Sequence, residues 1–245
     1  MRTRIAWLYP STGLLDGYLH TLAQSRGADL FVFRVVADPG ADLAVASLGE
    51  PDRLHAIAHS ARGVDPHVVA WACTAGSYIG GGENEVLQRN VLSSATGCPA
   101  TTTSSALTWA LRRTNTERVV ALTPYTQPVG GAFCDHLRDQ GFTVVAEAHA
   151  GHETDAAITA MTTSDIASLF ATSHAAISPT TSSPRAGVSI VLPCTALRSE
   201  LAVSQLEAMT GHQVVTANAA TIDHALHLAA AASVPGERPV GKDEE

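Results

Sequence analysis

The sequence predicts an α/β fold of two pseudo-symmetric, Rossmann-like halves, each a four-stranded parallel sheet, with the active site expected between them. Two observations lead to this prediction. Short β-branched runs alternate with stretches of helical periodicity, and the motifs of the first half return in the same order in the second. Because strands that alternate with helices are typical of parallel sheets covered on both faces, each half is expected to form one such sheet.

The individual elements follow from the local pattern. Apolar, β-branched runs predict eight strands, at Arg4–Leu8, Leu30–Val36, Val68–Ala72, Ala100–Thr103, Val119–Thr123, Thr143–Glu147, Val188–Leu192 and Gln213–Thr216. Apolar residues at three- and four-residue spacing predict helices at Leu14–Arg26, Asp52–Arg62, Ser105–Arg113, Val129–Gln140, Asp165–Ala176, Leu197–Met209 and Ala219–Ala232. The tail, residues 234–245, is polar and interrupted by Pro and Gly, so we expect it to be flexible.

The internal repeat connects four pairs of segments at nearly constant spacing. The pairs are Arg4–Thr12 with Arg118–Thr126, Phe31–Val36 with Thr143–Ala148, Val69–Ala75 with Ile190–Ala196, and Ser104–Leu111 with Ala219–Leu226. Four matches in one order indicate a duplicated unit. We therefore expect an N-terminal half at 1–115 and a C-terminal half at 116–218, with the last helix, 219–233, packing on the N-terminal half.

Composition excludes several classes of protein. The chain has 245 residues, a formal charge of −8, 16% charged residues and 45% apolar residues, which predicts a folded core rather than disorder. An acidic chain with scattered Lys and Arg is a poor ligand for nucleic acid. The first apolar run, Ile5–Tyr9, is shorter than the core of a signal peptide, and no run is long enough to span a membrane. We expect a cytoplasmic protein.

The four cysteines are expected to be free thiols, because they form no Cys-x-x-Cys pair and are sparse in so long a chain. Cys73 and Cys194 occupy equivalent places in the repeat, directly after a strand and before an expected helix. Ligands of parallel sheets bind outside the carboxyl ends of the strands, and a helix N-terminus lowers a thiol's pKa. The pattern predicts a facing pair of thiolates at neutral pH. Cys98 and Cys134 lack the repeat and are interpreted as structural.

Two weaker patterns receive structural interpretations. The glycines of Gly76–Gly82 lack the spacing of a nucleotide-binding loop, so we expect a loop that approaches or closes over the substrate. The pairs His149 with His152 and His224 with His227 have i,i+3 spacing but resemble no known zinc signature. They are expected on surface helices, and no metal site is predicted.

These motifs resemble the aspartate/glutamate racemase superfamily, and within it the branch that contains maleate cis-trans isomerase and arylmalonate decarboxylase. The resemblance covers nearly the whole chain and rests on ACTAGS (72–77), PCTALRS (193–199), LTPYT (122–126), GHETDAAI (151–158) and VVTANAATIDHAL (214–226). It implies an enzyme that needs no cofactor and binds a small dicarboxylate between two α/β halves.

The resemblance also implies roles for particular residues. Cys73 and Cys194 would be catalytic, and no metal would be bound. The substrate would be held by Pro10, Ser11, Thr12, Thr74, Ala75, Tyr125, Thr126, Asp155, Thr195 and Ala196. Where maleate isomerases have asparagines this chain has Gly13, Gly130 and Asp155, which leaves the identity of the acid open.

The expected reaction is the cis-trans isomerisation of a maleate-like dicarboxylate, in which Cys73 adds to the alkene and Cys194 acts as acid and base. Arylmalonate-type decarboxylation and two-thiol racemisation would use the same pocket. Gly13 resembles the decarboxylase branch, whereas Cys73 stands where that branch has glycine. A bilobed sensor of small acids is the non-enzyme alternative. Nucleic acid and membranes are not expected as partners, and a homo-oligomer is expected.

Overall fold

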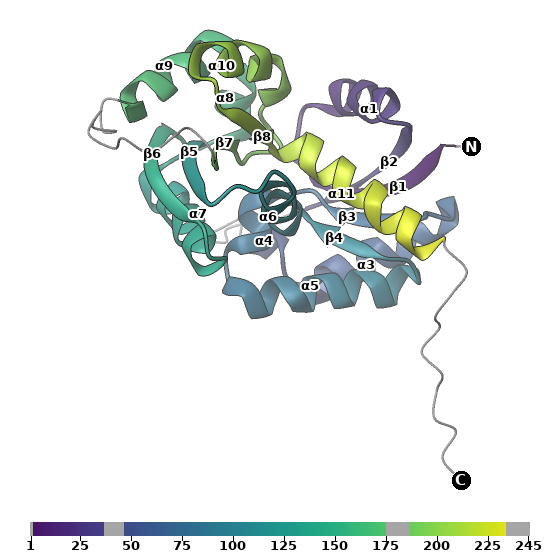
Figure 1. Cartoon of the computed structure of the whole chain (residues 1–245). Helices are drawn as coiled ribbons and strands as arrows, with labels where there is room; N and C mark the ends of the chain where they lie inside the picture. The colour runs from purple at the N-terminus through teal and green to yellow at the C-terminus, as the bar shows by residue number, and fades with distance from the viewer. Residues whose placement is uncertain (1, 37–46, 175–186, 234–245) are drawn as a thin grey trace.

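The computed structural model describes residues 2–36, 47–174 and 187–233, which form two four-stranded sheets (Figure 1). The first sheet has the order β2-β1-β3-β4, with strands β1 (Thr3–Pro10), β2 (Ala28–Val35), β3 (Val68–Trp71) and β4 (Ala100–Thr102). The second has the equivalent order β6-β5-β7-β8, with strands β5 (Arg118–Tyr125), β6 (Thr143–His152), β7 (Val188–Leu192) and β8 (Gln213–Thr216). All neighbouring strands are parallel, so the predicted fold class and the eight predicted strands are confirmed.

Helices connect the strands in both halves. In the first half they are α1 (Asp16–Ser25), α3 (Pro51–Ser60), the 3-10 helix η1 (Ala61–Val64), α4 (Thr74–Tyr78), α5 (Gly81–Thr96) and α6 (Thr103–Arg113). In the second half they are α7 (Gln127–Asp139), α8 (Asp155–Ala160), α9 (Thr163–His174), the 3-10 helix η2 (Ser199–Ala202), α10 (Val203–Thr210) and α11 (Ala217–Ala232). Among the described helices, none is long and apolar enough to cross a membrane.

The two faces of the first sheet are buried against different helices. Along β1, Ile5 and Trp7 pack with α1 and α11, while Ala6 and Leu8 point to the opposite face and pack with α3 and α5. All four side chains are fully buried. A strand buried on both faces reads as a continuous apolar run, which is why the sequence signals of these strands are strong.

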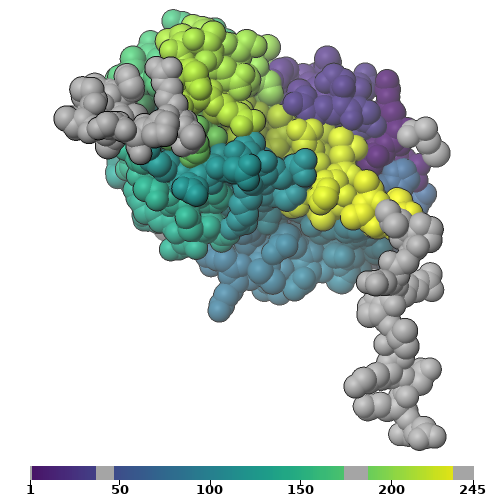
Figure 2. Space-filling model, viewed as in Figure 1, coloured from purple at the N-terminus to yellow at the C-terminus, as the bar shows by residue number. Residues whose placement is uncertain are grey.

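The last helix of each half packs on the other half. Leu107 and Leu111 of α6 belong to the core cluster of the second sheet, whereas Ile222 and Ala225 of α11 belong to the cluster of the first sheet. The two helices also pack against each other, and they occupy equivalent positions in the repeat. Figure 1 shows α6 between the two sheets, and Figure 2 shows the outer side of α11 (yellow) exposed next to the N-terminal segment. The halves therefore share their cores.

One region differs from the sequence-based expectation. The loop expected at Gly76–Gly82 is the end of α4 followed by the start of the sixteen-residue helix α5. Helix α5 has no apolar period that would reveal it, because its buried face includes Glu85 and Gln88. Both side chains are hydrogen-bonded inside, Gln88 to Gly76 O at 2.8 Å and Glu85 to three hydroxyl groups. The tail expected to be flexible, 234–245, lies outside the described residues.

Candidate active site

A cavity of about 290 Å³ lies at the carboxyl ends of the strands, and both halves contribute to its walls. It is lined by Tyr9, Pro10, Ser11, Thr12, Leu48, Cys73, Thr74, Ala75, Tyr125, Glu153, Thr154, Asp155, Cys194, Thr195 and Ala196. Pockets for drug-sized ligands typically have volumes of about 300–1,000 Å³. The cavity is therefore of a size for a small organic acid.

Cys73 follows β3 and caps the N-terminus of α4. Its backbone is extended, with φ at −142°, and its Sγ accepts a hydrogen bond from the Gly76 N–H at 3.4 Å. A Cβ at Gly76 would lie 2.9 Å from the Trp71 ring and 3.1 Å from Sγ, so a glycine is needed for this close approach. The helix start predicted after Cys73 is confirmed.

Cys194 lies at the equivalent end of β7, but no helix begins there. The Leu197 N–H donates to the Cys194 carbonyl at 3.3 Å, closing a turn, and helical structure starts only with η2. The expectation that a helix begins directly after Cys194 is therefore wrong.

Side chains from distant elements explain this turn. The carbonyl of residue 195 accepts a hydrogen bond from Tyr9 at 3.1 Å, that of residue 196 from Thr159 at 3.0 Å, and that of residue 197 from Asn218 at 3.2 Å. A helix would use these carbonyls for its own N–H groups. Tertiary contacts have replaced the local structure.

Both thiols are buried and electrically neutral at ordinary pH. Burial raises the pKa of Cys73 and that of Cys194 to about 12, and the nearby Asp155 carboxylate also raises both. The prediction of thiolates at neutral pH is therefore wrong. It considered the helix terminus alone, whereas the loss of hydration is the larger effect in this cavity.

The two thiols differ in the number of groups that would stabilise their charged form. Cys194 is approached by the Tyr125 hydroxyl and by the N–H groups of Ala196 and Leu197, and each of the three lowers its pKa against the effect of burial. At Cys73 one backbone N–H has this effect. A negative charge is thus better accommodated on Cys194 than on Cys73.

Three hydrogen bonds join the halves across the cavity. The Tyr9 hydroxyl donates to Thr195 O at 3.1 Å, and the Thr195 hydroxyl donates to Ala72 O at 3.1 Å. Thr12 donates to Asp155 at 2.5 Å. Each bond pairs a residue of the first half with one of the second, so these contacts set the width of the cavity.

The charged side chains of the lining are acidic. Asp155 and Glu153 line the cavity, and none of the lining residues is Lys or Arg. Arg34 lies over the Tyr9 ring, 5.2 Å from its centroid, but its guanidinium is bonded to Asp16 at 2.5 Å. Anionic groups of a substrate would therefore rely on hydroxyl and backbone N–H donors.

Two hydroxyl groups of the lining differ in their hydrogen bonding. Tyr125 is 8% exposed, and its hydroxyl donates to Pro193 O at 2.6 Å on the edge of the cavity. The Thr74 hydroxyl is buried and has no hydrogen-bond partner among the described residues. A buried hydroxyl without a partner loses hydrogen-bond energy, which a bound ligand would restore.

The structure brings all but one of the predicted site residues together in this cavity. The exception is Thr126, which precedes α7 and does not line it, although its repeat equivalent Thr12 does. Sequence reasoning missed Tyr9, Leu48, Glu153 and Thr154. Tyr9 and Thr154 adjoin predicted residues and could have been found by extending each motif, whereas Leu48 has no sequence signal.

Gly13 and Gly130 have similar surroundings. At Gly13 a Cβ would overlap the Tyr9 ring, and at Gly130 it would overlap the His149 ring and lie 2.5 Å from Thr123 Oγ1. In both places an aromatic ring from a neighbouring strand fills the space next to the glycine. Glycine at each of these positions leaves the room that the neighbouring ring occupies.

Of the two histidine pairs expected on surface helices, His149 and His152 are not on a helix, whereas His224 and His227 lie on helix α11. His149 and His152 lie on strand β6, and the His149 side chain is only 9% exposed. His224 does lie on helix α11, but its ring stacks on Trp109 at 4.8 Å and is bonded to Thr101 at 2.8 Å. His149 and His224 are thus held by packing, whereas His227 is exposed on its helix, as expected. All four cysteines are free, as predicted.

Comparisons with known proteins identify relatives of this arrangement. The family model described as arylmalonate decarboxylase matches residues 50–238. No curated protein matches the chain. Among solved structures, the maleate isomerase Iso from Pseudomonas putida S16 aligns with a TM-score of 0.81 and 19% identity, covering 98% of this chain and 96% of that one.

Two further solved structures are similar over most of their length. A variant of the Nocardia farcinica maleate cis-trans isomerase, with a covalently bound succinylcysteine intermediate, aligns with a TM-score of 0.80 and 17% identity, covering 93% of this chain and 92% of that one. A liganded double mutant of arylmalonate decarboxylase aligns with a TM-score of 0.79 and 19% identity, covering 98% and 96%. At these identities the solved structures establish the shared fold.

Proposed function

The chain belongs to the arylmalonate decarboxylase family, and from this we propose that it is a cofactor-independent cis-trans isomerase of a small maleate-like acid, with Cys73 as nucleophile and Cys194 as proton donor. The observation that carries the proposal is the presence of two buried thiols in one small cavity, with unequal stabilisation of their charged forms. The two thiols thus have different roles.

The unequal surroundings suit an addition and elimination sequence. The Cys73 sulfur forms a bond to one alkene carbon, and Cys194 gives its proton to the other carbon, so the double bond becomes a single bond that can rotate. The proton released by Cys73 replaces the one that Cys194 gave. Reversal of both steps after rotation yields the trans acid. Cys73 ends as a neutral thioether, whereas Cys194 carries transient negative charge, and it is Cys194 whose pKa is lowered by three neighbouring groups against the effect of burial.

Asp155 restricts the substrate. Asp155 and Glu153 line the cavity, and no basic side chain does. A substrate dianion would therefore be repelled by these two carboxylates. A maleate derivative with one carboxylate and one amide would instead donate a hydrogen bond to Asp155. Its carboxylate would be held by backbone N–H groups and by hydroxyl donors such as Thr74, whose buried hydroxyl has no partner among the described residues. We therefore propose that a maleate monoamide is a better substrate than maleate.

The same carboxylate supports a second candidate, a two-thiol racemase of an amino acid. In that reaction the substrate ammonium would pair with Asp155, and the thiols would remove and return the α-proton on opposite faces. Decarboxylation of an arylmalonate needs only one thiol as proton donor, so it leaves Cys73 without a role. A sensor of small acids would bind without turnover.

One experiment separates these reactions. The purified protein is incubated in deuterated water with maleate, its monoamide, phenylmalonate and both enantiomers of aspartate, and the products are followed by NMR. Isomerisation predicts conversion of cis to trans alkene with the monoamide. Racemisation predicts α-deuteration of aspartate, and decarboxylation predicts loss of carbon dioxide with one deuteron gained.

Variants test the assigned roles. Cys73→Ala and Cys194→Ala should each abolish isomerisation, while Cys98→Ser, a change outside the cavity, should leave the rate unchanged. With Cys194→Ala, mass spectrometry should detect a slowly formed adduct on Cys73. Decarboxylation of phenylmalonate by Cys73→Ala, with no isomerisation by the wild-type protein, would overturn the proposal.

A further inference from the structure

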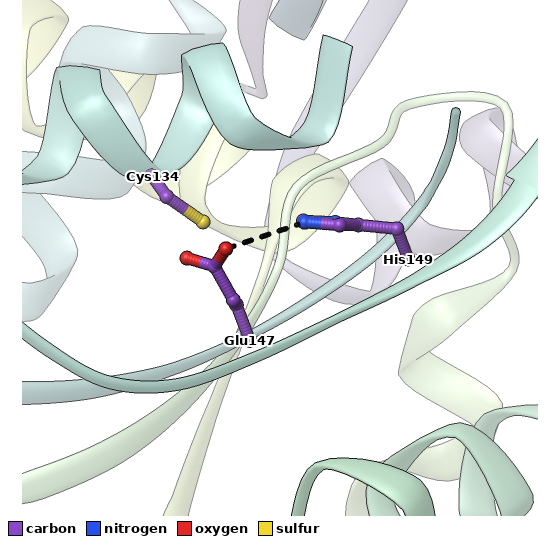
Figure 3. A group of neighbouring side chains, drawn as sticks. All are labelled: Cys134, Glu147 and His149. Atoms are coloured by element: carbon purple, nitrogen blue, oxygen red, sulfur yellow. Dashed lines mark ion pairs between the residues drawn. The ribbon is translucent and has the colours of Figure 1, made fainter. Parts of the chain in front are cut away.

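Three side chains that can bind metal ions meet between helix α7 and strand β6. Cys134 comes from α7, and Glu147 and His149 come from β6 (Figure 3). One ligand atom from each lies within 4.8 Å of the other two, the only such group of His, Cys, Asp and Glu side chains among the described residues. None of the three lines the cavity that contains Cys73 and Cys194.

His149 is oriented as a metal-binding histidine would be. Its Nδ1 is 2.7 Å from the Thr123 hydroxyl, and its buried Nε2 has no hydrogen-bond partner among the described residues. Figure 3 shows Nε2 directed at Glu147, whose Oε1 is 3.7 Å away. When Nδ1–H donates to an outer partner, the lone pair of Nε2 is free for a metal.

The other two ligands are also fixed in place. Cys134 is fully buried, so its sulfur has no competing contact with bulk water. Glu147 is held through Oε2 by Arg138 at 3.1 Å, which leaves Oε1 facing the histidine. Gly130 gives the His149 ring its room, because any side chain there would overlap it.

We propose that Cys134, Glu147 and His149 form a binding site for a divalent ion of the zinc class. Thiolate, imidazole and carboxylate in one set are typical zinc ligands, and water would complete a tetrahedron. On binding, the Cys134 S–H bond breaks, a sulfur–metal bond forms, and the proton passes to solvent. Tetrahedral zinc places its ligand atoms about 3.3–3.8 Å apart, so the group has to contract by about 1 Å. Glu147, the most exposed of the three, can supply this movement.

The ion would connect α7 to β6 behind the active site. The chain enters α7 directly after Tyr125, at the end of β5, and β6 leads into Asp155. Both residues line the cavity, so the ion would stabilise the wall that carries them. This role is independent of the proposed reaction, and its test needs no substrate.

Zinc affinity is measured by competition with a chromophoric chelator on the full chain after dialysis against a strong chelator. The wild-type protein should bind one equivalent of Zn²⁺, and its melting temperature should rise. Co²⁺ should give the absorption of a sulfur–cobalt bond. Cys134→Ala and His149→Gln should weaken zinc binding by more than the roughly 10–100-fold expected for Thr123→Val, which removes only an outer partner.

The controls assign the ion to this site. Cys98→Ser and the double variant Cys73→Ser with Cys194→Ser should bind zinc as the wild-type protein does. If Cys134→Ala is not folded, Glu147→Gln, a change at a partly exposed residue, provides the same comparison. Loss of zinc binding in the double variant with no loss in His149→Gln would overturn the proposal, as would a wild-type protein that binds no more tightly than His149→Gln.

Discussion

The burial of the two thiols predicts an unusual pH dependence of their alkylation. At pH 7 a thiol whose pKa is about 12 is ionised in roughly one molecule in 10⁵, against about one in 30 for a free thiol of pKa about 8.5. Because the thiolate is the nucleophile, Cys73 and Cys194 should react on the order of 10³-fold more slowly than in the unfolded chain.

The assay compares folded and denatured protein with isotope-coded iodoacetamide and mass spectrometry of the labelled peptides. In the folded protein the rates of Cys73 and Cys194 should rise about tenfold per pH unit from pH 7 to 11, whereas in denaturant they should level off near pH 9. Equal rates for the two states at pH 7 would refute the reasoning, because they would show that the hydrogen-bond donors outweigh the loss of hydration.

Three further predictions concern the cavity and its support. Asp155→Asn removes an anion from the lining, so kcat/KM for maleate relative to its monoamide should rise by roughly tenfold or more, since like charges cost several kcal/mol. Tyr125→Phe removes a hydroxyl that lowers the pKa of Cys194, so kcat/KM should fall by a factor that corresponds to about 1–3 kcal/mol of transition-state free energy, and an unchanged value would place the phenol outside the reaction. Glu85→Ala removes the carboxylate that accepts hydrogen bonds from three hydroxyl groups. The free energy of unfolding in urea should fall by about 3 kcal/mol.

Glu85 should also contribute to the acid sensitivity of the fold. Burial raises the pKa of this carboxyl, but the hydrogen bonds from Ser105, Thr102 and Ser104 together lower it by more. The overall pKa is therefore below the ordinary value. The charged form is therefore favoured by folding. Its stabilisation is present above the unfolded pKa of about 4.3 and is lost as the pH falls through the folded value. Urea unfolding of the wild-type protein and of Glu85→Ala at pH 7 and pH 3 should show a difference that shrinks at the lower pH.

Sequence reasoning succeeded where the fold depends on local pattern. The apolar runs gave the strands, and the repeat related Cys73 to Cys194 at equivalent strand ends, where the cavity lies. It failed where tertiary contacts decide the outcome. The chain after Cys194 is a turn because side chains from elsewhere bind its carbonyls, and α5 escaped detection because Glu85 is buried by hydrogen bonds rather than by apolar packing.

The distances between side chains could not be predicted from the sequence either. Cys134 was interpreted as structural because it has no equivalent in the repeat, and His149 as a surface residue because the spacing of His149 and His152 resembles no zinc signature. Their proximity arises from the packing of α7 on β6. The raised pKa of each active-site thiol likewise depends on how completely the cavity walls exclude water, which no local motif encodes.

The reciprocal packing of α6 and α11 has a consequence for motion. In a bilobed protein whose lobes meet only at a flexible connection, ligands enter when the lobes swing apart. Here each lobe contributes its final helix to the core of the other, so a swing would pull Leu107 and Ile222 out of apolar surroundings. Complete exposure of such side chains costs about 1.5–3 kcal/mol each. We therefore expect a ligand to enter through local movement at the mouth of the cavity, and the two lobes to unfold as one cooperative unit.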